Sequence, residues 1–182
     1  LLEKHWTSDG FLFEQEEDQS KSDAKEMLKN YFEFIQKNPV HLYSTERIFK
    51  FSLNKCEVSG KCDRIDRTPN GEIKIYDYKT SKYQKSEKEL KKDIQLAIYA
   101  MYSNQPKTDD KNSGLGRIPK ELSLLSLRHE NPKVSVTFTE EKLEEFKTYI
   151  DNIALKIREG DFPSKPSYNC QYCDYRDLIC PD

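Results

Sequence analysis

Apolar side chains alternate or recur along the chain in patterns that predict both strands and helices. Phe49 and Phe51 alternate with polar neighbours, which indicates a strand. Two later runs are separated by the segment Thr-Pro-Asn-Gly, and Pro followed by Asn-Gly favours a tight reversal. These runs therefore predict one strand that leads into a β-hairpin. The three predicted strands cover residues 44–53, 57–67 and 72–80.

Apolar residues at helical spacing predict three longer helices. Ser86 and Glu89 form the S-x-x-E pattern of a capping box, which marks the start of the second helix. Thr139 and Gly160 bound the third as its expected N-cap and C-terminal stop. We expect loops at 11–21, which is acidic, and at 104–117, and two further strands at 121–129 and 133–138. The predicted helices span about 22–37, 86–103 and 140–159.

The second hairpin strand carries a charged end. Side chains two apart share one face of a strand, so Ile73, Ile75, Asp77 and Lys79 lie on the same side. The preceding strand can place Asp63 beside Asp77 and Lys79. Two carboxylates and an ammonium then converge, and carboxylates are typical ligands of Mg²⁺. An Asp-x-Lys in a strand is by itself also compatible with a simple surface ion pair.

Three sequence blocks in this order resemble the PD-(D/E)xK nuclease superfamily, and within it the RecB-like and AddB-like branch. The resemblance implies a mixed α/β restriction-endonuclease-like core, with a central mixed sheet flanked by helices. The blocks are Gly60-x-x-Asp63-Arg64-Ile65-Asp66, Ile75-Tyr76-Asp77-Tyr78-Lys79-Thr80 and Gln95-Leu96-x-x-Tyr99-Ala100.

The same resemblance assigns roles to five residues. Asp63 and Asp77 would be ligands of Mg²⁺ or Mn²⁺, and Lys79 would be the catalytic lysine. Gln95 and Tyr99 would complete the site or touch the DNA backbone. Five lysines near this end of the hairpin form either a solvated helix face or contacts with DNA phosphates, and the sequence leaves both interpretations open. They are Lys82, Lys85, Lys88, Lys91 and Lys92.

Composition sets broad limits on the class of protein. The chain has 182 residues, of which 34% are charged and 35% hydrophobic, and it is long enough for one domain with a core. No apolar run approaches the ~20 residues that cross a bilayer, and no secretory signal pattern opens the chain, so we expect no membrane and a cytoplasmic location. The net charge is −2, so nucleic-acid binding must depend on a local basic patch.

Three cysteines lie close together near the end of the chain. Cys170, Cys173 and Cys180 are spaced like metal-binding thiolates, although ordinary free thiols are the alternative. Zinc and iron-sulfur clusters each require four ligands. The resemblance implies a [4Fe-4S] cluster whose fourth cysteine lies upstream of this chain. We therefore divide the chain into a nuclease domain, residues 1–168, and a cysteine-motif tail, residues 169–182.

The predicted function is that of a metal-dependent DNA nuclease which hydrolyses phosphodiester bonds. The resemblance suggests an exonuclease module, placed at the C-terminus of a UvrD-like or AddAB-type helicase that acts in DNA repair or recombination. DNA and a helicase motor are the implied partners. A stand-alone CRISPR-associated nuclease of the same type, or an inactive DNA-binding module with the same fold, are the alternatives. The helix-like start at Leu1 suggests an N-terminally truncated fragment.

Overall fold

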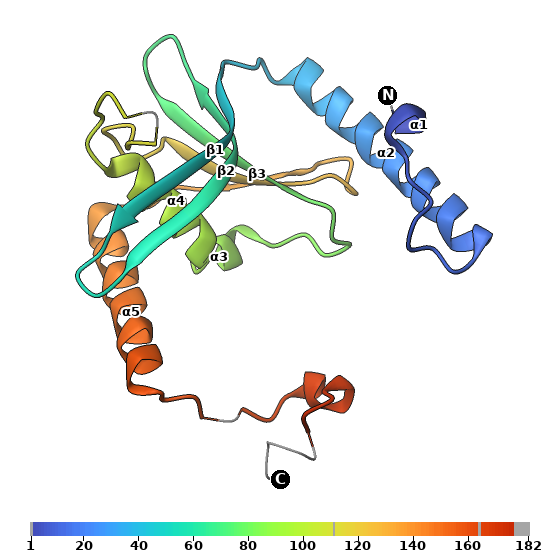
Figure 1. Ribbon diagram of the computed structural model, residues 1–182. Helices are drawn as coiled ribbons and strands as arrows, with labels where there is room; N and C mark the ends of the chain where they lie inside the picture. Colours follow the sequence, from blue (N-terminus) through green and yellow to red (C-terminus); the bar gives the residue numbers. More distant parts are fainter. Residues whose placement is uncertain (1, 111, 164, 177–182) are drawn as a thin grey trace.

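A five-stranded mixed sheet with helices on both faces forms the centre of the computed structural model, which describes residues 2–110, 112–163 and 165–176 (Figure 1). The strand order is β1-β2-β3-β4-β5, with one parallel pair, β3 and β4, among antiparallel ones. The strands are β1 (Leu42–Ser52), β2 (Glu57–Arg67), β3 (Ile73–Lys79), β4 (Glu121–Ser126) and β5 (Lys133–Val136). The helices are α1 (Leu2–His5), α2 (Glu14–Lys37), α3 (Glu87–Leu90), α4 (Ile94–Asn104), α5 (Glu140–Glu159) and the short 3₁₀ helix η1 (Tyr168–Tyr172).

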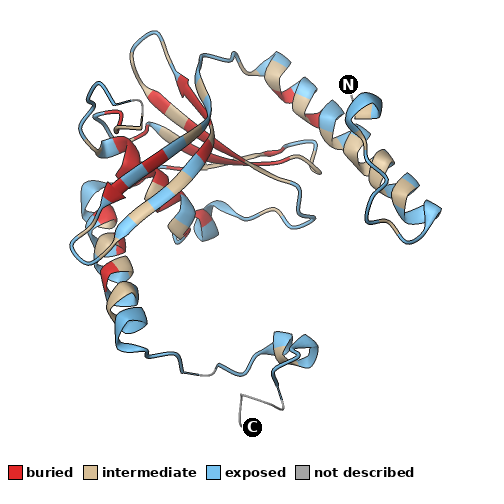
Figure 2. Ribbon diagram, in the orientation of Figure 1, coloured by how far each residue is buried: buried red, intermediate tan, exposed pale blue. Residues whose placement is uncertain are grey.

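The alternation of β3 divides the core between the two faces of the sheet. Ile73 and Ile75 belong to the larger apolar cluster, which includes buried residues of α4 and α5. Tyr76 points the other way and packs with Phe34 of α2. Figure 1 shows α2 on the opposite side of the sheet from α4, and Figure 2 shows buried positions concentrated on the strands and α4. The predicted mixed α/β architecture is confirmed.

The hairpin forms as the sequence indicates. Residues 68–71 reverse the chain, with the amide of Gly71 donating to the carbonyl oxygen of Thr68 at 2.8 Å. Gly71 has φ = +78°, a conformation that glycine adopts without steric cost. The strands pair in antiparallel register from Arg64 opposite Tyr76 to Arg67 opposite Ile73. The turn thus fixes which residues of β2 lie beside β3.

Two expectations about helices are wrong. The acidic segment is not a loop, because α2 begins at Glu14 and places its acidic residues in the first turn, where the helix dipole favours negative charge. The helix predicted over 86–103 is broken. The capping box at Ser86 starts only the short α3, and Asp93 begins α4 by accepting from the amide of Leu96 at 3.1 Å. An Asp side chain that binds a backbone amide in the middle of a segment takes a donor from the helix, so a continuous helix is disfavoured there.

The third predicted helix, α5, begins and ends at the expected residues. Thr139 caps α5 by accepting from the amide of Lys142 at 3.3 Å, and Gly160 ends it in the left-handed region at φ = 71°. In the described ranges, no helix combines the length and apolar character that crossing a membrane requires.

Candidate active site

Asp77 lies near the end of β3 and forms the centre of a polar cluster. Its side chain is only 4% exposed. Two donors reach its Oδ1: Gln95 Nε2 at 2.8 Å and the Tyr99 hydroxyl at 3.1 Å. Both donors come from α4, which covers this face of the sheet. The helix therefore holds one carboxylate oxygen of Asp77, and the other, Oδ2, is buried beside Lys79.

Lys79 and Gln95 connect this cluster to solvent. Lys79 Nζ lies 2.6 Å from Asp77 Oδ2 and donates to Gln95 Oε1 at 3.0 Å. Gln95 Nε2 also donates to the Tyr99 hydroxyl at 2.8 Å, and that hydroxyl in turn reaches the carbonyl oxygen of Lys61 at 3.1 Å. The Lys79 side chain is 34% exposed, so its ammonium lies at the border between the buried carboxylate and water.

Asp63 of β2 lies beside Asp77 and Lys79. Its Oδ2 accepts from the backbone amide of Tyr78 at 2.9 Å, between the two charged residues of β3. The regular β2–β3 ladder covers Arg64 to Arg67 of β2 and ends one residue short of Asp63, so the carboxylate takes a donor that a backbone carbonyl would otherwise use. The structure thus brings together all five residues of the predicted site: Asp63, Asp77, Lys79, Gln95 and Tyr99.

Burial and charge shift the pKa values in this cluster. Burial raises the pKa of the Asp77 carboxyl, the ammonium of Lys79 opposes that shift, and the nearby charge of Asp63 adds to it. Burial and the charge of Asp77 also raise the pKa of the Tyr99 hydroxyl, which therefore stays protonated and donates. The site combines a neutral donor, a cation and two acids.

The carboxylate oxygens suit a hard divalent cation that keeps some of its waters. Asp77 Oδ2 is buried, and in the described part of the chain its one close polar neighbour is the ammonium of Lys79 at 2.6 Å. Asp63 supplies a second carboxylate beside it. Mg²⁺ is commonly bound through one or two carboxylates, with waters and substrate phosphate completing its shell. Among the described residues, no group of three or more His, Cys, Asp or Glu is placed to hold a metal.

One irregularity beside this site was not predicted from the sequence. Glu46, in the middle of β1, has φ = +49°, which is uncommon for a residue other than glycine. It lies opposite Asp63, because its neighbours Thr45 and Arg47 pair with Arg64 and Cys62. Its carboxylate forms an ion pair with Lys61. Backbone strain of this kind tends to occur at functional sites, and no residue type in the segment signals it.

The five lysines expected to border the site lie in different surroundings. Lys85 pairs with Asp93 at 2.7 Å, and Lys91 pairs with Glu87 at 2.8 Å. Lys92 lies in a pocket with Phe146 and Tyr149, on the side of α5. Lys88 is exposed on α3, and Lys82 lies beside α2. Two of the five are thus paired with acids, and Lys82 and Lys92 line two different pockets.

The cysteine motif is described only in part. Cys170 and Cys173 are free thiols in and just after η1, and the amide of Cys173 donates to the carbonyl oxygen of Cys170 at 3.2 Å. Cys180 lies outside the described residues. Cys62 is fully buried in the apolar core, and burial raises the pKa of its thiol. It is therefore no substitute for the fourth ligand of a cluster.

Comparison with protein families places the polar cluster in a known context. The sequence model of the PD-(D/E)XK nuclease superfamily matches residues 1–181. The chain belongs to this superfamily. The match supports a nuclease. Among curated protein sequences, none matches the chain significantly.

One solved structure has a similar fold, and a second aligns less well. The crystal structure of a candidate exonuclease from Eubacterium rectale aligns with a TM-score of 0.54 and 17% identity. The alignment covers 99% of this chain and 66% of that protein, so the chain spans slightly less than two thirds of its length. A second crystal structure, of the protein SSO0001, aligns with a TM-score of 0.45 and 18% identity, over 90% of this chain and 70% of the other.

Proposed function

We propose that the chain is a metal-dependent DNA nuclease, and that it works as the exonuclease module of a helicase-nuclease in DNA repair or recombination. The observation that carries the proposal is the convergence of Asp63, Asp77 and Lys79 on one end of the hairpin, with Gln95 and Tyr99 of α4 behind them. Membership of the nuclease superfamily supports phosphodiester hydrolysis.

Asp63 and Asp77 would hold Mg²⁺ or Mn²⁺ through their carboxylate oxygens. The bound cation would polarise the scissile phosphate and lower the pKa of the attacking water. Lys79 lies beside Asp77 Oδ2, where its ammonium can orient that water or offset the charge that develops on the phosphate. Gln95 holds the lysine by accepting from it at 3.0 Å, and Tyr99 keeps the Asp77 carboxylate in place.

Cleavage of end-labelled single-stranded and double-stranded DNA with Mg²⁺ tests the proposal. Lys79→Ala should lower kcat by about 10²- to 10³-fold, which is typical for removal of one group that stabilises developing charge. Lys74→Ala is the matched control, because Lys74 lies on the same strand, faces the other side and is partly buried too. Equal activity of wild type, Lys79→Ala and Lys74→Ala would refute the catalytic assignment. A wild type that binds DNA without cleaving it would favour the inactive module.

The cysteine tail carries a separate part of the proposal. We infer that Cys170, Cys173 and Cys180 provide three ligands of a [4Fe-4S] cluster in the full-length protein, with a fourth thiolate from outside this chain. The exposed thiol of Cys173 and the partly exposed thiol of Cys170 support it, because both are accessible for ligation. Iron and sulfide content of anaerobically purified protein tests the idea. Cys173→Ser should lose the cluster, whereas Cys62→Ser should retain it.

A further inference from the structure

The segment that leaves β3 directly after Lys79 is held in place from both sides. We call residues 80–85 the ridge. Two side chains of the turn between β4 and β5 bind backbone carbonyl oxygens of the ridge. One side chain of the ridge binds a carbonyl oxygen of that turn. The contacts are Arg128 Nε to Thr80 O at 2.7 Å, His129 Nε2 with Lys82 O at 3.0 Å, and Gln84 Nε2 to Asn131 O at 2.8 Å.

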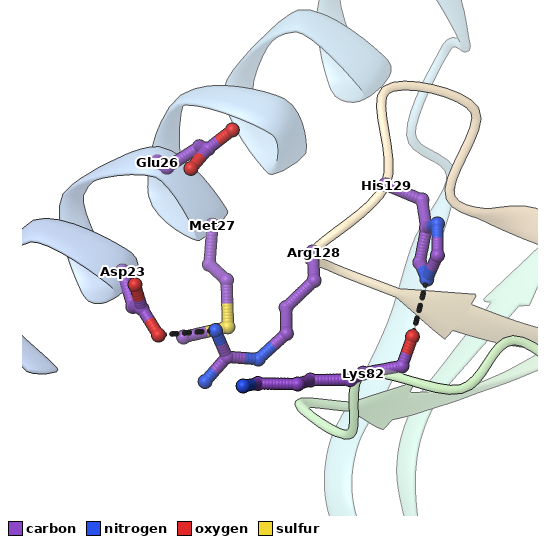
Figure 3. Close-up of a pocket in the computed structure, with 6 residues that line it drawn as sticks. All are labelled: Asp23, Glu26, Met27, Lys82, Arg128 and His129. Atoms are coloured by element: carbon purple, nitrogen blue, oxygen red, sulfur yellow. Dashed lines mark hydrogen bonds and ion pairs between the residues drawn. The ribbon is translucent and has the colours of Figure 1, made fainter.

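The turn between β4 and β5 is itself bound to α2. Asn30 Nδ2 donates to the carbonyl oxygen of Leu127 at 2.9 Å, and Arg128 forms an ion pair with Asp23. Figure 3 shows Arg128 extending from the turn to Asp23 of α2, with Lys82 beside it and His129 bound to the Lys82 backbone. The ridge is therefore held in place through this turn by α2.

An exposed aromatic ring stands on this ridge. Tyr83 is 64% exposed, yet its hydroxyl donates to Glu89 Oε1 at 2.7 Å. Glu89 is itself fixed by Ser86, whose backbone amide donates to it at 2.8 Å. The ring is thus restrained at its polar end while much of its surface remains open to solvent. A restrained aromatic side chain loses little conformational entropy when a flat partner stacks on it.

The ridge lies between two members of the candidate site. Tyr83 follows Lys79 by four residues, which limits their Cα separation to about 14 Å. At its other end, Lys85 pairs at 2.7 Å with Asp93, the residue that caps α4 just before Gln95. A strand whose phosphate occupies the site therefore has bases within reach of Tyr83.

Lys82, the residue before Tyr83, places one positive charge next to the aromatic ring. Lys82 lines a pocket of about 250 Å³ with Arg128, His129, Met27 and the acids Asp23 and Glu26. Arg128 neutralises Asp23, whereas Lys82 forms no ion pair with any described residue. An exposed aromatic ring next to a cation is the combination that proteins use to bind single strands, with the ring stacking on a base and the cation contacting a phosphate.

Given the nuclease function proposed above, we propose that the ridge binds an unpaired strand of the DNA substrate, with Tyr83 stacked on a base and Lys82 in contact with a phosphate. Stacking of this kind needs a base whose flat face is free, and bases inside a duplex are covered by their neighbours. The ridge therefore gives the enzyme a preference for single-stranded DNA next to the cleaved bond.

Fluorescence anisotropy with labelled oligothymidylate and with a labelled blunt hairpin duplex, both in EDTA so that no cleavage occurs, tests the proposal. Tyr83→Ala should weaken binding of the single strand about five- to 150-fold and change duplex binding less than twofold. Tyr83→Phe keeps the ring and should bind almost as wild type does. Lys82→Gln should reduce the slope of log K against log salt for the single strand by about 0.7.

Tyr149→Ala is the matched control, because Tyr149 is a 51% exposed tyrosine on α5. The proposal is overturned if Tyr83→Ala binds the single strand normally, loses both substrates equally, or is no weaker than Tyr149→Ala. Circular dichroism of each variant establishes that the fold is retained. Binding in EDTA is independent of catalysis, so this failure leaves the nuclease proposal untouched. Conversely, an inactive protein with ridge-dependent binding would refute only the nuclease proposal.

Discussion

Replacing Asp77 by Asn should stabilise the fold while it removes activity. Asp77 Oδ2 is buried and, apart from the ion pair with Lys79 at 2.6 Å, has no hydrogen-bond donor among the described residues; a buried polar group without a hydrogen bond costs about 1–3 kcal/mol. Asn keeps an oxygen for Gln95 and Tyr99 and replaces the charged oxygen with a neutral amide. The pKa of Asp77 is raised even with the ion pair to Lys79 in place, so the charged carboxylate is disfavoured in the folded chain after that pair is counted. We expect a net gain of about 1 kcal/mol.

Thermal unfolding in EDTA measures this gain. For a chain of this size, about 1 kcal/mol corresponds to a rise in Tm of about 2–4 °C. Addition of Mg²⁺ should raise the Tm of the wild type and leave that of Asp77→Asn unchanged, because a ligand stabilises only the state that binds it. The same preparations should show loss of DNA cleavage in the variant.

The pH dependence gives a second, independent test. The pKa of Asp77 is raised by burial, so the folded chain keeps a proton over a pH range in which the unfolded chain has lost it. The stability of the wild type therefore falls as pH rises from the unfolded value of about 3.9 through the raised pKa. Asp77→Asn has no carboxyl group that titrates at this position. The difference in Tm between the variant and the wild type should therefore grow as pH rises through that range, and stay constant at higher pH. A lower Tm for the variant at neutral pH, or a difference independent of pH, would refute the reasoning.

Three further substitutions test the packing that supports the site. Arg64→Leu should lower the free energy of unfolding by about 3–5 kcal/mol, because it leaves Asp66 charged and 3% exposed, and Asp66→Asn in the same chain should recover part of the loss in urea unfolding. Gly114→Ala should cost about 1–3 kcal/mol and lower Tm, because a Cβ there would lie 2.1 Å from the backbone oxygen of Gln105; an unchanged Tm would contradict that contact. Thr139→Ala should cost about 1 kcal/mol through loss of the α5 cap, whereas Thr139→Ser should cost little in the same melts.

The sequence alone determined the hairpin and the positions of its charged residues. The turn at 68–71 fixes the register of β2 and β3, and the period of two in a strand then assigns each side chain to a face. Asp77 and Lys79 therefore follow Ile73 and Ile75 on the core side whatever the rest of the chain does. The caps at Thr139 and Gly160 are equally local, and they gave the bounds of α5 correctly.

Only the tertiary structure decided how the remaining parts meet. The interruption at Asp93 was hidden by an apolar period that continues across it: Leu90 and Leu96, on either side of the break, are both buried, and Asp93 caps the second helix between them. The left-handed Glu46 depends on pairing with β2, and the ridge depends on contacts with a turn more than forty residues away. Contacts between distant segments leave no periodic signal in the sequence. They arise because the sheet brings those segments side by side, and this determines what surrounds the site.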